Sequence, residues 1–73
     1  MFMENYIPAT HKYYIFSTGT KLKSKYFDTR REALDYMYKY CAKHSIQVEL
    51  SENDKHEKKY SNHQGVRFYI NRV

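Results

Sequence analysis

The pattern of apolar and polar residues predicts two β-strands, a helix and two further strands, in that order. The first strand is predicted over residues 12–17, Lys-Tyr-Tyr-Ile-Phe-Ser, which include several aromatic or β-branched side chains. Residues 17–20, Ser-Thr-Gly-Thr, are typical of a turn. Residues 21–27 then alternate with a period of two, which predicts the second strand of a hairpin.

The alternation within residues 21–27 separates lysines from apolar residues. Leu22 and Tyr26 are predicted on the core side of the strand, and the other side carries Lys21, Lys23 and Lys25. Alternate residues of a strand lie about 6.8 Å apart, about twice the charge spacing along one strand of duplex DNA. If one side of the segment from Tyr13 to Phe16 shares this face, aromatic rings stand beside the lysines, as on sheets that stack unpaired bases. The alternative interpretation is that these lysines protect an edge strand from aggregation.

A helix is predicted to begin at residue 28 or 29 and to end near residue 44. Thr29 and Glu32 have the spacing of a capping box, and Asp28 is the alternative N-cap. At 100° per residue one face is mainly apolar. That face holds Ala33, Leu34, Met37, Cys41 and His44. We therefore expect an amphipathic helix that covers one face of the sheet.

The last two strands are predicted at residues 46–50 and in the final eight residues, because both segments alternate. Val66, Phe68 and Ile70 face one side of the last strand, and Arg67, Tyr69 and Asn71 face the other. Residues 51–65 are rich in charged and polar side chains and end in a predicted return turn at 62–65. This charged hairpin loop either extends the two strands or forms a mobile tip.

The predicted fold class is α+β, a single domain over residues 1–73 with the order β-β-α-β-β. Its largely antiparallel four-stranded sheet carries one amphipathic helix packed on one face. Residues 1–11 show no sustained period and contain Pro8, so they are expected to form an irregular lead-in. Leu34, Met37 and Cys41 are expected to pack against Leu22, Tyr26, Val48, Phe68 and Ile70.

Composition limits the environment and the partners of the chain. A chain of 73 residues with a single cysteine, Cys41, forms no internal disulfide. It contains no apolar run of the length of a signal peptide or of a membrane span, so we expect a cytoplasmic protein with no membrane partner. Thirteen Lys and Arg residues against eight Asp and Glu residues give a net charge of +5, which favours nucleic acid or an anionic protein surface as partner.

The candidate binding residues extend beyond the three lysines. Arg30 and Arg31 open the helix, where positive charge opposes the helix dipole, so they are either part of a basic patch or two solvated side chains. The residues expected to bind nucleic acid or another partner are Lys21, Lys23, Lys25, Arg30, Arg31, Tyr13, Arg67 and Tyr69.

Metal and catalytic chemistry have little support in the sequence. The only candidate metal ligands are Cys41, His44, His56 and His63, and the last two are spaced more widely than in structural zinc sites. No Gly-rich phosphate loop, nucleophile elbow or HExxH pair occurs. We expect no cofactor, no metal and no enzyme activity, and the alternative is a metal-dependent nuclease that uses His56, His63 and nearby acids.

Part of the chain resembles a known family of DNA-binding domains. The segment from Tyr14 to Met37, with Lys-Ser-Lys-Tyr-Phe followed by Asp-Thr-Arg-Arg-Glu-Ala-Leu, resembles the arm-type domains at the N-termini of phage integrases. Those domains have three strands before their helix, whereas two are predicted here, so no contact residue is transferred. In size and charge the chain also resembles small accessory proteins of phages and mobile elements, including anti-CRISPR proteins.

These observations lead to two hypotheses for the function. The first is a non-catalytic module that contacts nucleic acid through a sheet face bearing Lys and Tyr. The second is an inhibitor or regulator of a nucleic-acid-processing machine that binds a protein partner, with a homodimer paired through a sheet edge as one form of assembly.

Overall fold

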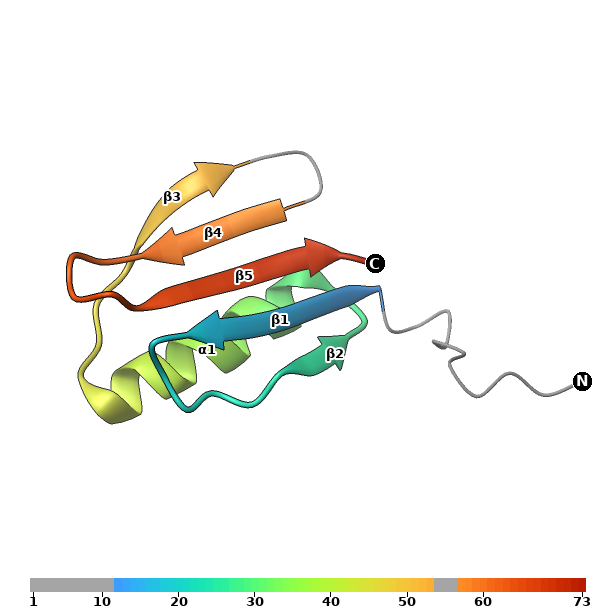
Figure 1. Cartoon of the computed structure of the whole chain (residues 1–73). Helices are drawn as coiled ribbons and strands as arrows, with labels where there is room; N and C mark the ends of the chain where they lie inside the picture. Colours follow the sequence, from blue (N-terminus) through green and yellow to red (C-terminus); the bar gives the residue numbers. More distant parts are fainter. Residues whose placement is uncertain (1–11, 54–56) are drawn as a thin grey trace, which may run out of the picture.

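The structure, a computed structural model, describes residues 12–53 and 57–73. In this part a five-stranded antiparallel sheet lies against one helix, with the strands in the order β2-β1-β5-β4-β3 (Figure 1). The elements are β1 (Tyr13–Thr18), β2 (Lys25–Phe27), α1 (Arg30–His44), β3 (Glu49–Asn53), β4 (Glu57–Ser61) and β5 (Arg67–Arg72). The predicted α+β class is confirmed, and the sheet has five strands where four were predicted.

The register of β1 and β5 fixes which side chains face the helix. Ile15 lies opposite Ile70, and Phe16 lies opposite Tyr69. Because side chains alternate along a strand, Ile15 and Ile70 face α1 and Phe16 and Tyr69 face away from it. The buried core is made of Ile15, Ala33, Met37, Cys41, Tyr60, Val66, Phe68 and Ile70. We call the sheet surface opposite α1 the open face.

Helix α1 has the predicted start and the predicted buried face. Thr29 is the N-cap, and its hydroxyl oxygen accepts a hydrogen bond of 3.2 Å from the backbone N–H of Glu32. In return, a carboxylate oxygen of Glu32 accepts one of 3.1 Å from the backbone N–H of Thr29. Ala33, Met37 and Cys41 are buried as predicted. No helix in the described part of the chain is long and apolar enough to cross a membrane.

Strand β2 is shorter than predicted and faces the other way. Only Lys25–Phe27 is a strand, because side chains from α1 bind the backbone of the loop before it. The hydroxyl of Tyr36 donates to the carbonyl oxygen of Lys23 at 2.8 Å, and the backbone N–H of Lys21 donates to the hydroxyl of Tyr40 at 3.1 Å. Tyr26 pairs with Tyr14 on the open face, so its predicted place in the core is wrong, and Phe27 packs there instead.

The charged segment 51–65 contributes strands on either side of residues 54–56, which lie outside the described residues, as does the predicted lead-in 1–11. β3 begins at Glu49 and continues to Asn53, and β4 spans Glu57–Ser61. The predicted strand at 46–50 is therefore shifted to 49–53, and it does not form an extended hairpin with the last strand, because β4 lies between β3 and β5. Turn 62–65 is confirmed: the side-chain oxygen of Asn62 accepts hydrogen bonds from the backbone N–H of Gln64 at 2.8 Å and of Val66 at 3.2 Å.

The helix covers only part of its side of the sheet. Its backbone lies close to β1, β2 and β5, and it reaches β4 through the ring contact of Tyr38 with Tyr60. Figure 1 shows α1 behind β1 and β5, with β4 and β3 extending beyond it. The connection from α1 to β3 carries Ile46 and Val48, which are half-buried against the core. The protein therefore presents two surfaces of interest, the open face and the uncovered region beside β3.

Candidate functional site

Four aromatic side chains form a continuous stripe across three strands of the open face. Tyr26 of β2 and Tyr14 of β1 are cross-strand partners with ring centroids 4.7 Å apart. Phe16 of β1 and Tyr69 of β5 are partners as well, with centroids 4.6 Å apart and ring planes only 12° apart. A distance of 6.0 Å between the rings of Tyr14 and Phe16 joins the two pairs. We call these four residues the aromatic stripe.

The aromatic stripe lies on a surface that no other described element covers, since α1 occupies the opposite face. Tyr26 is 40% exposed, and the other three side chains are half-buried. Contiguous apolar rings at a protein surface mark an interaction site more often than isolated ones do. The exposed parts of these rings are therefore available for contact with a flat or apolar ligand.

Two cationic side chains, Arg67 of β5 and Lys59 of β4, lie beside the aromatic stripe. Arg67 follows the same face of β5, opposite Thr18, and is exposed. Lys59 of β4 lies directly opposite Tyr69 and forms an ion pair of 3.5 Å with Glu52 of β3. Toward β3 the face is mixed in sign, because Glu49, Glu52 and Glu57 lie on it together with Lys59.

Asn71 occupies the remaining position beside the stripe. It is the cross-strand partner of Tyr14, and Glu57 lies opposite it on β4. Its side-chain oxygen is buried and accepts no hydrogen bond from the described residues. An unpaired buried carbonyl is unfavourable, so this position is one of the least satisfied polar sites of the fold.

The predicted row of three lysines on one side of a strand is wrong. Lys21 and Lys23 lie in the loop between β1 and β2, and only Lys25 belongs to a strand. Lys25 pairs with Ile15 and so lies on the helix side of the sheet edge. Its ammonium group lies 5.5 Å from the ring centroids of both Phe27 and Tyr36, a cation–π arrangement. The loop is held by α1 instead of pairing with β1, which explains the lost alternation.

The two arginines at the start of α1 point to different surroundings. Arg30 places its guanidinium 5.3 Å from the ring centroid of Tyr13, and its Nε is buried without a hydrogen-bond partner among the described residues. Tyr13 pairs with Phe27 and therefore lies on the helix side. Arg31 is exposed and lies 3.8 Å from Asp35. The eight predicted binding residues therefore do not form one surface. Of the eight, the strand register places only Arg67 and Tyr69 on the open face.

Three residues of the aromatic stripe, Tyr14, Phe16 and Tyr26, were absent from the predicted site. The signal for the first two was present in the sequence, because they flank Ile15 and must point away from it if Ile15 is buried. Tyr26 could not be found in the same way, since the lysine alternation indicated the opposite face. The cross-strand pairing brings the three together with Tyr69.

The candidate metal ligands are not brought together in the part of the chain that the structure describes. No three side chains of His, Cys, Asp or Glu form a cluster there. Cys41 is buried, and burial raises the pKa of its thiol. His44 packs its ring 4.3 Å from that of Tyr40, and His63 is exposed in the turn before β5. His56 lies outside the described residues.

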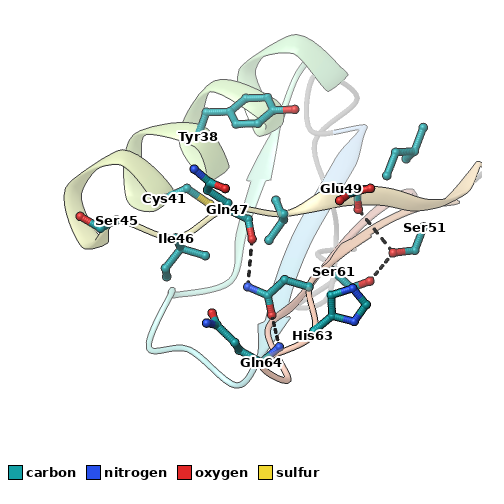
Figure 2. Close-up of a pocket in the computed structure, with 13 residues that line it drawn as sticks. Tyr38, Cys41, Ser45, Ile46, Gln47, Glu49, Ser51, Ser61, His63 and Gln64 are labelled. Carbon is teal, nitrogen blue, oxygen red and sulfur yellow. Dashed lines mark hydrogen bonds between the residues drawn. The ribbon is translucent and has the colours of Figure 1, made fainter.

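A groove of about 860 Å³ lies between the C-terminal half of α1 and the β3–β4 hairpin (Figure 2). Tyr38 lines it from the helix, and Leu50 from β3. These two side chains are among the most exposed large apolar ones, at 51% and 47%. Asn62 and Gln47 both line the groove, and a hydrogen bond of 2.9 Å from the side-chain amide of Asn62 to the carbonyl oxygen of Gln47 joins them. The groove is thus an open, partly apolar surface held by a defined turn.

Tyr60 and Tyr38 meet where this groove approaches the core. Their rings lie edge to face with centroids 6.4 Å apart. The pKa of the Tyr60 hydroxyl is raised, first by burial and second by the nearby Tyr38. Tyr60 is buried in the core, and its contact with Tyr38 joins the core to the groove that Tyr38 lines.

Comparison of the chain with protein-family models, with curated proteins and with solved structures finds no match.

Proposed function

We propose that this protein is a non-catalytic, cytoplasmic module that binds single-stranded nucleic acid through the open face of its sheet. The observation that carries the proposal is the aromatic stripe, four adjoining rings on the face that α1 leaves uncovered. Sheet surfaces that bind single strands stack two or three unpaired bases on such side chains. Duplexes bury their base faces, so they cannot use a stripe of this kind.

The charge of the protein supports the same choice of ligand. A net charge of +5 attracts a phosphate backbone. Arg67 lies on the open face beside the aromatic stripe, where its guanidinium can reach a phosphate next to a stacked base. Glu52 and Glu57 lie on the β3–β4 side of the same face. We therefore expect the strand to follow β2, β1 and β5 and to avoid β3.

The test is a titration of labelled oligonucleotides, followed by fluorescence anisotropy at 50 and 200 mM salt. Ten-residue oligo(dT), oligo(U) and a matched DNA duplex are compared. We expect both single strands to bind more tightly than the duplex, and the affinity to fall with salt by a slope of about 0.7 per phosphate contacted. Arg67→Gln should lower that slope by about one contact.

The aromatic stripe is tested with Tyr26→Thr and Tyr69→Thr, since threonine keeps the preference for a strand. Loss of one stacked base costs about 1–3 kcal/mol, so each variant should weaken binding about 5- to 150-fold. Tyr38→Gln is the matched control, because it removes an exposed tyrosine on the opposite side of the molecule. Equal binding by wild type and both stripe variants would overturn the proposal, and so would a preference for the duplex.

A further inference from the structure

We infer that the outer edge of β3, together with the groove beside it, binds an extended peptide that alternates basic and apolar residues. This surface is centred on β3, at the far edge of the sheet from β2, whereas the aromatic stripe proposed for nucleic acid lies on β2, β1 and β5. The peptide would add to the sheet as a sixth strand, with its main chain paired to β3.

The edge of β3 is suited to strand addition. β3 is the last strand of the sheet order, and among the described residues it pairs only with β4. All five of its residues, Glu49–Asn53, are exposed. Its free edge therefore offers main-chain N–H and C=O groups to a partner.

The side chains of β3 specify what that partner carries on each face. Glu49 and Glu52 pair with Ser61 and Lys59 and so lie on the open face, whereas Leu50 pairs with Tyr60 and lies on the helix side. The register of β3 shifts between Leu50 and Glu52, so the two carboxylates share the open face although they are three residues apart in the sequence. Residues on the open face of an added strand would meet the two carboxylates, and a residue on its other face would meet Leu50. This pattern selects Lys or Arg at one set of positions and apolar side chains at the other.

The groove provides the space for the apolar positions. Helix α1 packs mainly on β1, β2 and β5, and it reaches β4 through the contact of Tyr38 with Tyr60. The groove on the helix side of β3 is lined by Tyr38 and by the half-buried Val48. Figure 2 shows Tyr38 on α1 across the groove from β3. An aliphatic side chain beside Leu50 would cover exposed apolar surface of both walls.

Charge favours this partner over a second copy of the chain. Two copies paired through β3 would place four carboxylates, Glu49 and Glu52 of each copy, on one face of a short ladder, where like charges repel. A basic strand would instead neutralise them. Glu49 and Glu52 are the charged residues of β3, and Lys59 partly neutralises Glu52, so Glu49 offers the stronger attraction for a basic side chain of the peptide.

The experiment measures binding of a fluorescein-labelled nine-residue peptide of alternating Lys and Val, capped at both ends, by anisotropy. Three further peptides serve as controls on the wild-type protein. In one, Glu replaces Lys, and in the other two, one or the other set of alternate amides is N-methylated. We expect the Lys peptide to bind, the Glu peptide to bind at least tenfold more weakly, and one of the methylated peptides to lose binding because its methyl groups block main-chain pairing.

Protein variants locate the binding surface. Glu49→Gln and Glu52→Gln should each weaken the Lys peptide about two- to fivefold, as expected for cross-strand charge pairs, and Leu50→Ser should weaken it by a similar factor. Asp35→Asn is the matched control, because it removes a carboxylate from the exposed side of α1. Oligonucleotide affinity should be unchanged in Leu50→Ser, because Leu50 lies on the helix side of β3, and in Asp35→Asn, which separates the peptide surface from the aromatic stripe.

Equal binding of the Lys and Glu peptides would overturn the inference, as would full binding by both methylated peptides. Analytical ultracentrifugation provides the remaining comparison. A dimer that is lost in Leu50→Ser would assign the edge to a second copy of the chain and would likewise overturn the peptide assignment. A monomer that binds the Lys peptide, with the losses described above, supports it.

Discussion

Phe16 and Tyr69 stack their rings as direct cross-strand partners of β1 and β5, on the sheet face away from the helix. These two strands also carry Ile15 and Ile70 on the other face. The central pair of strands is therefore held on both faces, by the core on one and by stacked rings on the other. Stability and the proposed binding function thus depend on the same two rings, and the two contributions can be separated.

The first prediction concerns the energy of this stacked pair. Aromatic pairs contribute about 0.5–1.5 kcal/mol beyond the area that they bury. In a cycle of Phe16→Leu, Tyr69→Leu and the double variant, we expect a coupling free energy of that size. Urea unfolding followed by circular dichroism measures the free energy of unfolding for each protein.

A second cycle on the same scale provides the control for the first. Phe16→Leu combined with Tyr38→Leu joins two residues on opposite sides of the sheet, so their effects should add within about 0.5 kcal/mol. A Phe16–Tyr69 coupling no larger than this value would mean that the rings contribute through burial alone.

The second prediction tests the corrected position of Lys25. Its ammonium lies 5.5 Å from the rings of both Phe27 and Tyr36, and an exposed cation–π contact contributes about 0.5–1 kcal/mol. Lys25→Met keeps the apolar stem and removes the charge, so it should lower the free energy of unfolding by about that amount. Thermal unfolding by calorimetry measures the change.

Lys23→Met is the control for Lys25, because Lys23 lies in the neighbouring loop, where only its backbone carbonyl makes a described contact. Removing its charge should leave stability within about 0.5 kcal/mol of the wild type. If the two lysine variants lose the same stability, the effect reflects net charge and not contact with the rings.

The helix and β5 could be predicted from sequence because local signals and burial agree there. Thr29 and Glu32 form the capping box that their spacing indicated. Phe68 and Ile70 are buried as the alternation of the last segment predicted. In such segments the side chains that the hydrophobic period places on one face are the ones that face the core.

The rest could not be predicted because it depends on contacts between distant residues. Only Tyr60 of β4 is buried, so this strand has too little apolar alternation to be recognised. The length of β2 is set by the hydroxyls of Tyr36 and Tyr40, which bind the loop from another element. The aromatic stripe requires the pairing of Tyr14 with Tyr26, and an apparent alternation of lysines indicated the opposite face for Tyr26.

The third prediction concerns the two glycines, which both have positive φ but differ in their surroundings. At Gly19, with φ of 80°, an added Cβ would lie 2.4 Å from the backbone oxygen of Gly65. At Gly65, with φ of 88°, no atom lies within 4 Å of such a Cβ. Gly65→Ala should therefore cost only the backbone strain, about 1–2 kcal/mol, and Gly19→Ala should cost clearly more because backbone must move as well.

Urea midpoints of the two alanine variants, compared at equal m-value, measure this difference. Gly65→Asn serves as an internal check, because asparagine tolerates positive φ better than alanine and should recover part of the loss. Equal costs at the two positions would mean that the contact between the β1–β2 loop and the turn before β5 does not hold in solution.

The fourth prediction is a pH dependence of stability that comes from Cys41. Burial raises the pKa of the folded thiol above that of the unfolded chain, which is about 8.5. As pH rises past that value the unfolded thiol loses its proton first, so the folded state binds more protons and its stability falls. Below the unfolded pKa this contribution is fully present, and it is lost as pH rises through the folded pKa.

The free energy of unfolding should therefore decrease more steeply between pH 8 and 10 in the wild type than in Cys41→Ala, by at most about 1.4 kcal/mol per pH unit. The titration of tyrosines and lysines contributes equally to both proteins, so it cancels in the comparison. This includes Tyr60, whose raised pKa also lowers the free energy of unfolding as the pH rises, but at higher pH. A thiol reagent gives an independent measure, because a buried protonated thiol should react only as fast as the protein opens. Two outcomes would contradict this prediction: parallel pH profiles for the two proteins, or labelling of the folded state at the rate of a free thiol. Either result would show that Cys41 is accessible to solvent and that α1 does not bury it.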